Sequence, residues 1–167
     1  MIDQERCIRN NKTGQSSDFF LHIPPDVDGK YLYTEKNRTM KIEQNVIDQI
    51  VAQAQKDAPI ESCGYLLGKD GVATENYPMT NTDHAEEHFS FDPREQFAAL
   101  RHARAQGLQI LANWHSHPAS PSRPSQEDLR LANDPNIQYV IVSLHEGIHV
   151  NSFKIENNQV VSKEIHL

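Results

Sequence analysis

Two histidines placed two residues apart, in the run 114–118, constrain this chain more than any other feature of its sequence. In an extended strand, residues two apart point to the same face, so the imidazoles of His115 and His117 can converge on one ion. Asp128 follows after a proline-rich loop, and Ser125, three residues before it, is a good helix N-cap. The pattern therefore predicts a strand end that faces a helix start, with three candidate metal ligands between them.

Two histidines and one carboxylate are the ligand set of a catalytic zinc site, which keeps its fourth tetrahedral position open for water. Structural zinc sites are usually closed by four ligands, often thiolates, and the cysteines of this chain are Cys7 and Cys63 alone. A His-x-His pair is also common on surfaces, and a serine before an aspartate can be simple helix capping. The combination nevertheless predicts one zinc ion per chain, bound by His115, His117 and Asp128.

Glu61 is the candidate proton acceptor. It precedes the apolar run 63–67, which should form a buried strand, and a carboxylate there is costly unless it serves a site. The alternative is a solvated residue in the loop before that strand. Zinc lowers the pKa of bound water toward about 7 and polarises a carbonyl oxygen, so a carboxylate nearby can take up the proton.

These residues together resemble the signature of the JAMM (MPN-plus) zinc metalloproteases. That signature is an upstream glutamate followed by His-x-His-Pro, six residues and Ser-x-x-Asp, and it is filled here by Glu61, His115-Ser116-His117-Pro118, Ser125 and Asp128. The stretch 59–68 also resembles the region around the catalytic glutamate in compact prokaryotic members. The resemblance covers the chain from about residue 41 to the C-terminus, and it implies that Ser125 hydrogen-bonds the oxyanion of the tetrahedral intermediate.

The resemblance implies hydrolysis of a peptide or isopeptide bond after the Gly-Gly tail of a ubiquitin-like protein. The chain lacks the long insertions of eukaryotic deubiquitinases of the family, since the segment 79–88 is short, and this favours a small substrate. Compact prokaryotic members resemble processors of ThiS- or MoaD-like sulfur carriers, which we therefore expect as the substrate class. A general zinc peptidase acting on other peptides or proteins stays open, and so does a homodimer.

Two other function classes fit less well. A zinc nucleobase or nucleoside deaminase, whose fold is similar, would need a Pro-Cys-x-x-Cys motif that Cys7 and Cys63 cannot supply. A non-catalytic MPN scaffold is natural for relatives that have lost ligands, and the complete ligand set argues against it. The formal net charge of -7 argues against a nucleic-acid partner and favours a neutral or basic protein partner.

Hydropathy and cysteine content bear on location. No basic segment followed by an apolar one opens the sequence and no long apolar run occurs, so neither export nor a membrane span is expected. A disulfide between Cys7, in a polar segment, and Cys63, in an apolar run, is not expected either. We therefore expect a cytoplasmic protein in which Cys63 is a packed small residue.

The domain organisation follows from hydrophobic periodicity. Residues 1–39 lack it, apart from apolar islands at 19–23 and 31–33, and are predicted to be a partly disordered N-terminal extension. Residues 40–167 are the predicted JAMM/MPN metalloprotease domain. Its expected fold class is α/β, a sandwich of mixed sheet with about three helices, similar to the cytidine deaminase fold.

Individual elements of this domain can be placed as well. Helical spacing of apolar residues from Ile42 to Ala54 predicts one helix that ends near Pro59. It also predicts a second helix from Asp92 to Gly107 with Phe97, Leu100 and Ala103 buried, and a third after Ser125. Strands are expected at 63–68, 72–79, 108–115, 137–144, 148–155 and 160–166, with a short additional strand considered at 88–91.

Three further side chains, those of His84, His88 and Trp114, each allow a functional and a structural interpretation. His84 and His88 are four residues apart, which would suit a second metal site, but they lie in an expected loop, where surface histidines are the default. Trp114 should alternate to the strand face opposite His115, so packing in the core is favoured over stacking on a substrate.

Overall fold

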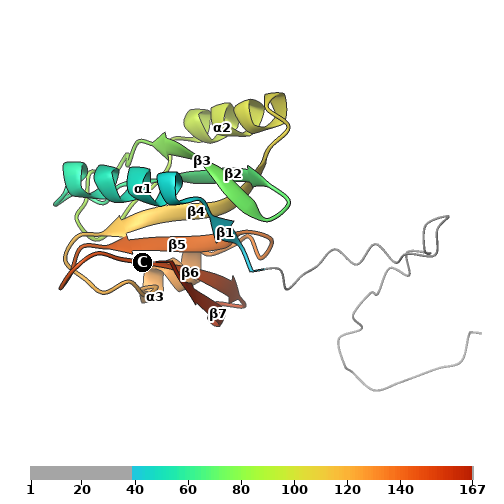
Figure 1. The fold of residues 1–167 in the computed structure, drawn as a ribbon. Helices are drawn as coiled ribbons and strands as arrows, with labels where there is room; N and C mark the ends of the chain where they lie inside the picture. Colours follow the sequence, from blue (N-terminus) through green and yellow to red (C-terminus); the bar gives the residue numbers. More distant parts are fainter. Residues whose placement is uncertain (1–38, 167) are drawn as a thin grey trace, which may run out of the picture. The chain divides into compact units, whose positions relative to one another are not determined.

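A seven-stranded mixed sheet forms the centre of the computed structural model, which describes residues 39–166 (Figure 1). The strand order is β1-β3-β2-β4-β5-β6-β7. Together with three helices, this sheet confirms the predicted α/β class. The predictions for the N-terminal extension, including its two apolar islands and Cys7, lie outside the described residues, apart from residue 39.

The elements in chain order are β1 (Lys41–Ile42), α1 (Gln44–Asp57), β2 (Cys63–Lys69), β3 (Val72–Met79), α2 (Pro93–Ala105), β4 (Gln109–His117), α3 (Gln126–Leu131), β5 (Gln138–Ser143), β6 (His149–Glu156) and β7 (Gln159–Ile165). β4 pairs antiparallel with β2 and parallel with β5, whereas β1 pairs parallel with β3. The remaining neighbours are antiparallel. The strand that ends with the two histidines therefore lies in the middle of the sheet, hydrogen-bonded on both sides.

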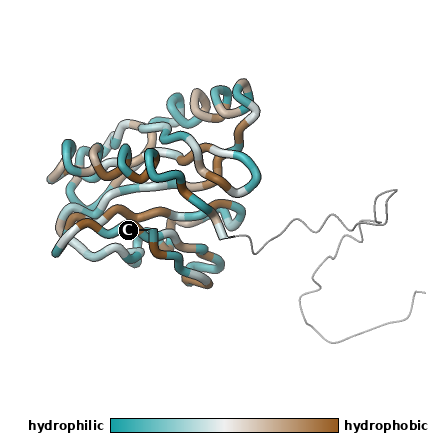
Figure 2. Tube along the Cα trace, in the orientation of Figure 1, coloured by the Kyte–Doolittle hydropathy of each residue, from teal (hydrophilic) through white to brown (hydrophobic). Residues whose placement is uncertain are grey.

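Helix α1 covers one face of the sheet. Its buried residues Val46, Ile50 and Ala54 recur every fourth residue, and they pack in one core cluster with Leu66 of β2 and Trp114 of β4. Figure 2 shows the matching alternation of polar and apolar residues along this helix. The residues ahead of the helix differ from the prediction, because Lys41–Ile42 forms a short edge strand beside β3 instead of helical turns.

Helices α2 and α3 lie on the other face. Leu129 of α3 packs against Ile141 and Phe153. The side chain of Gln96 in α2 donates a hydrogen bond to the Tyr65 hydroxyl at 3.1 Å, and Tyr65 lies opposite Asn113 in the sheet. Cross-strand partners share a face, so both helices lie over the face to which His115 belongs.

The predicted buried stripe of α2 is partly wrong. Phe97 is 65% exposed, while Ala99 and Ala103 are fully buried. The sequence pattern favoured the bulky Phe97, but the fully buried positions of α2 are small residues, namely Ala103 of the predicted stripe and Ala99, which lay outside it. The short strand considered at 88–91 is reduced to one isolated bridge between Phe91 and Asn81.

The burial of Trp114 and the end of α2 at Gly107 agree with the predictions. Trp114 is fully buried on the α1 side, and its indole Nε1 donates to Asn76 Oδ1 at 2.9 Å, which confirms the core reading. Gly107 ends α2 with a positive φ of 68°, a conformation that favours glycine. Among residues 39–166, no helix is both long and apolar enough to cross a membrane.

Candidate active site

The two histidines at the end of β4 converge as their spacing predicts. His115 lies opposite Cys63 of β2 and Ile141 of β5, and both imidazoles are buried. The Nε2 atoms of His115 and His117 are 3.0 Å apart. Two ring nitrogens at this distance can be bridged by one proton or can bind one cation together.

Asp128 reaches the histidines from the first turn of α3. Ser125 caps this helix: its Oγ accepts a hydrogen bond from the Asp128 amide at 3.1 Å, and its own amide donates to Asp128 Oδ2 at 2.7 Å. The Asp128 carboxylate then lies with Oδ1 3.3 Å from His115 Nε2 and Oδ2 3.5 Å from His117 Nε2. The capping box thus also directs the carboxylate toward both imidazoles.

Glu61 lies just before β2 and adds a second carboxylate to the cluster. It is only 4% exposed, so the reading as a solvated loop residue is wrong. Its Oε1 is 3.9 Å from His117 Nε2, and one potential ligand atom each from Glu61, His115 and His117 lie within 4.8 Å of one another. These three residues form a candidate metal-binding group, with Asp128 in contact with both histidines.

Neighbouring groups hold the histidine rings in place. His117 Nδ1 is 3.1 Å from the Pro121 carbonyl oxygen, to which it can donate, and this leaves Nε2 to face the carboxylates. The ring of Phe89 stacks on His115 with centroids 4.7 Å apart and an interplanar angle of 27°. Each ring orientation is therefore set by a contact outside the cluster.

The two carboxylates have opposite electrostatic environments. Burial raises the pKa of Glu61 to about 8, an effect that the nearby His117 opposes. Burial would also raise the pKa of Asp128, but hydrogen bonds with His115 and His117 outweigh it and hold that pKa well below its usual range. Asp128 therefore stays ionised, whereas Glu61 can exchange a proton near neutral pH.

The remaining groups suit a metal site as well. Burial lowers the pKa of His115, which favours the neutral imidazole that binds metals. Cys63 is buried beside His115 in the sheet, and burial raises the pKa of its thiol to about 12, so it stays a thiol. Two imidazole nitrogens and an ionised carboxylate thus form a donor set that fits a hydrolytic metal ion, with no thiolate among them.

A loop that the sequence did not mark as functional borders the site. His88 is bound at both ring nitrogens, 2.8 Å from Glu127 Oε2 on α3 and 2.9 Å from Asp83 Oδ2, so it pairs with carboxylates instead of forming a metal site with His84. No local pattern in 81–91 signals the contact between His88 and Glu127, because these residues are 39 positions apart in the sequence.

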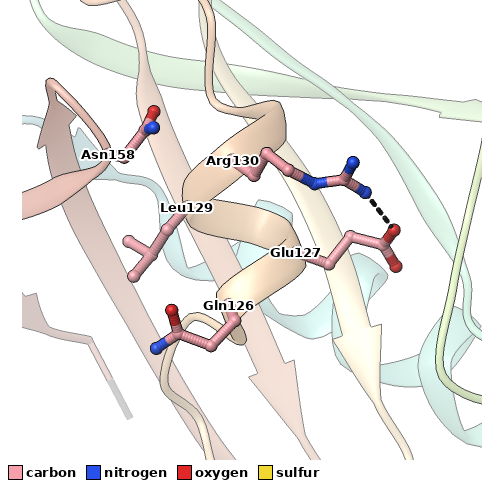
Figure 3. Close-up of a pocket in the computed structure, with 5 residues that line it drawn as sticks. All are labelled: Gln126, Glu127, Leu129, Arg130 and Asn158. Carbon is pink, nitrogen blue, oxygen red and sulfur yellow. Dashed lines mark hydrogen bonds and ion pairs between the residues drawn. The ribbon is translucent and has the colours of Figure 1, made fainter.

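A surface pocket lies beyond the site, on α3 (Figure 3). It is lined by Gln126, Glu127, Leu129, Arg130 and Asn158, and the Glu127 and Arg130 side chains form an ion pair of 2.8 Å at its edge. Neither histidine nor Asp128 lines it. The pocket is therefore separate from the metal-binding group.

Comparison with known proteins places the chain in a family. Residues 43–156 match the family model of prokaryotic homologs of the JAB domain. The CysO-cysteine peptidase of Mycobacterium tuberculosis is 28% identical over 130 residues, which cover 75% of this chain and 89% of that protein. The desampylase of Pyrococcus furiosus is 31% identical over 91 residues, or 54% and 64% of the two chains.

A solved structure extends the comparison to the fold. A solution structure of a Desulfitobacterium hafniense protein is 40% identical, with a TM-score of 0.69 over 75% of this chain and 90% of that one. The family match also agrees with the resemblance drawn from Glu61, the His115 to Pro118 run, Ser125 and Asp128. This chain belongs to the prokaryotic JAB family, within the JAMM proteins that its sequence resembles.

Proposed function

We propose that this protein is a zinc metallopeptidase that hydrolyses a peptide or isopeptide bond after the C-terminal Gly-Gly of a ubiquitin-like or sulfur-carrier protein. The observation that carries the proposal is the convergence of two histidines with two carboxylates whose pKa values are shifted in opposite directions. Such a separation supports metal binding by one carboxylate and proton transfer by the other.

His115, His117 and Asp128 are the proposed zinc ligands, with one ion per chain. The Asp128 oxygens lie against both Nε2 atoms, at 3.3 and 3.5 Å, whereas the nearest contact of Glu61 with these imidazoles is 3.9 Å. A zinc ion in this position supplies Lewis acidity and lowers the pKa of water toward about 7. Three protein ligands leave a fourth position for water or substrate.

Glu61 is the proposed general base and acid. In the metal-free site burial raises its pKa to about 8, so its carboxyl group can both take up and return a proton near neutral pH. Its burial keeps bulk water from competing for that proton.

Ser125 is the proposed donor to the oxyanion of the tetrahedral intermediate. Its Oγ accepts the Asp128 amide, which leaves the hydroxyl proton free to be donated, and Ser125 is exposed to an incoming substrate. One such donor typically contributes about 3 kcal/mol to lowering the barrier.

A compact protein substrate is supported by several observations. The relatives called CysO-cysteine peptidase and desampylase favour a ubiquitin-like or sulfur-carrier partner for this chain too. The connection from β3 to α2 is only the segment 80–92, too short for a long insertion, which favours a small substrate. The net charge of -7 favours a protein partner with a neutral or basic docking face over a nucleic-acid partner. We propose that the protein acts in the cytoplasm.

The test uses a folded ThiS-like sulfur carrier that bears one alanine after its terminal Gly-Gly. We expect zinc-loaded protein to remove the alanine, which mass spectrometry of the carrier detects as a loss of one residue. A free peptide with the same tail should be cut far more slowly, because a glycine-rich tail offers few side chains and must be ordered on binding. Equal rates on peptide and carrier would indicate a general peptidase, and no cleavage of either would contradict the proposal.

A further inference from the structure

The side-chain amide of Asn81 is buried and uses its full hydrogen-bonding capacity. Asn81 is 7% exposed. Its Nδ2 donates to the carbonyl oxygens of Glu61 and His88, both at 3.0 Å. Its Oδ1 accepts from the backbone amides of Asp83 at 3.1 Å and Ser90 at 3.4 Å. An amide has two donors and two acceptor lone pairs, so Asn81 has none left over.

These bonds make Asn81 the junction between Glu61 and the loop 81–91. The Glu61 carbonyl is held by Asn81, and the Glu61 amide donates to the carbonyl of Ala85 in the same loop at 3.0 Å. Both backbone polar groups of Glu61 are thus satisfied by this loop and not by the neighbouring strand of the sheet. Asn81 also bonds to His88 and Ser90 within the loop. The loop conformation that presents the Ala85 carbonyl to Glu61 therefore depends on the same side chain that holds the Glu61 carbonyl.

The far end of the loop is tied to the helix that carries Asp128. His88 lies between Asp83 of the loop and Glu127 of α3, and Glu127 is the residue before Asp128. Phe89, the next residue, stacks on His115. The loop therefore contacts elements on both sides of the metal-binding group, the segment with Glu61 and the helix with Asp128.

We propose that Asn81 is a positioning residue for Glu61, because its amide joins the Glu61 carbonyl to the loop that spans the site and so fixes where the carboxylate lies relative to His117. The proposal rests on the proposed function, in which Glu61 transfers the proton. The Glu61 carboxylate lies 3.9 Å from His117 Nε2. It must keep that separation in order to transfer a proton without becoming a metal ligand. A displacement of about 1 Å at a reacting group can lower the rate by about 100-fold.

Asn81→Ala and Asn81→Asp test this role. The first removes all four hydrogen bonds, and the second keeps the acceptor for the loop amides but removes both amide donors. We expect kcat on the alanine-extended ThiS-like carrier to fall by about 10- to 100-fold, with KM and zinc content close to wild type. In the Glu61→Gln background, Asn81→Ala should add little further loss, because a residue that acts through Glu61 has nothing left to position.

Thr82→Ala is the matched control. Thr82 donates its hydroxyl to the Ser90 carbonyl at 3.1 Å within the same loop and has no bond to Glu61. Its backbone amide also donates to Ser90, and that bond remains in the variant. Thr82→Ala should therefore keep wild-type kcat, which separates general loosening of the loop from the loss of the contact with Glu61.

Amide hydrogen exchange gives a readout that does not depend on catalysis. The Glu61 amide should exchange at least about tenfold faster in Asn81→Ala than in wild type, and should be unchanged in Thr82→Ala. If the wild-type enzyme fails to cut the carrier, the proposed function fails, while this comparison still decides whether Asn81 holds Glu61.

Four results would overturn the proposal. They are unchanged exchange at Glu61, a kcat within about twofold of wild type in both Asn81 variants, a full further loss when Asn81→Ala is added to Glu61→Gln, and failure of both Asn81 variants to fold while Thr82→Ala folds normally. The last result would make Asn81 a folding residue.

Discussion

The hydroxyl of Ser116 accepts a hydrogen bond from the backbone amide of Ser62 at 2.8 Å, so the residue between the two histidines is joined to the residue after Glu61. The Ser116 amide in turn donates to the Ser62 carbonyl at 2.9 Å. Ser116 is fully buried and Ser62 nearly so. The segment with Glu61 and the strand with the two histidines are therefore connected through the sheet as well as through the loop 81–91.

Ser116→Ala should be destabilising, because it leaves the buried Ser62 amide without this acceptor. We expect a loss of about 1–3 kcal/mol in the free energy of unfolding, measured by urea denaturation. Ser120→Ala, at an exposed position in the following loop, is the control and should change stability by less than about 0.5 kcal/mol. Equal effects of the two substitutions would contradict the importance of the Ser116 to Ser62 bond.

Metal binding should depend on the two histidines. Purified wild-type protein should contain one zinc per chain, and the His115→Ala/His117→Ala double variant should contain none while its circular dichroism spectrum stays that of a folded protein. Elemental analysis of both proteins measures this. Stoichiometric zinc in the double variant would exclude these histidines as the ligands.

Glu61→Gln should separate proton transfer from metal binding. The amide cannot accept the proton, whereas the proposed ligands are untouched, so we expect zinc to be retained and turnover to fall by about 100-fold or more. Zinc content and cleavage of the carrier are measured on the same preparation. A zinc-free variant would make Glu61 a ligand, and an active one would remove it from the mechanism.

The raised pKa of Glu61 should make the metal-free protein less stable as the pH rises. Its pKa changes from 4.5 in the unfolded chain to about 8 in the folded protein, so the folded state binds the proton more tightly between these values. The stability that Glu61 contributes is complete below pH 4.5 and is lost by about pH 8.

The measurement is urea unfolding of metal-free wild type and Glu61→Gln across this pH range. Wild type should lose on the order of a few kcal/mol relative to Glu61→Gln as the pH rises. Burial lowers the pKa of His117, but its contacts with Asp128, the Pro121 carbonyl and Glu61 together raise it above its usual value. The part of this pH dependence that comes from Asp128 and Pro121 should persist in the variant. Parallel curves for the two proteins would contradict the assignment of the shift to Glu61.

The first 39 residues should be dispensable for folding and hydrolysis, since the site and the sheet lie after them. A truncated protein that begins at Met40 keeps the Met40 side chain, which is 3% exposed and belongs to the α1 core. Thermal unfolding and cleavage of the carrier should match those of the full chain. Aggregation or loss of activity would show that the extension contributes to the core or to a partner surface.

Local patterns predicted the parts of the site that depend on short spacing. The alternation of His115 and His117 along a strand and the capping box of Ser125 and Asp128 each involve neighbouring residues, so the sequence alone could place them. The sequence also predicted helix α1, because its apolar residues recur at helical spacing.

Contacts between distant segments were not predictable in this way. Asn81 and Glu61 meet only because the end of β3 returns beside the start of β2, and nothing near Asn81 in the sequence signals it. Phe97 was expected to be buried because size and spacing favoured it, whereas Ala99 and Ala103 occupy the fully buried positions of α2. In both cases tertiary packing decides, which a local pattern does not contain.

The central place of β4 has a consequence for how the protein would acquire its metal. Since β4 is hydrogen-bonded to β2 and β5, folding of the sheet alone places His115 and His117 side by side on one face. In zinc fingers, by contrast, the ion is needed to organise its own ligands. A chelator should therefore empty this site and leave a folded template that takes up the ion again without refolding, so that metal supply regulates activity without turnover of the protein.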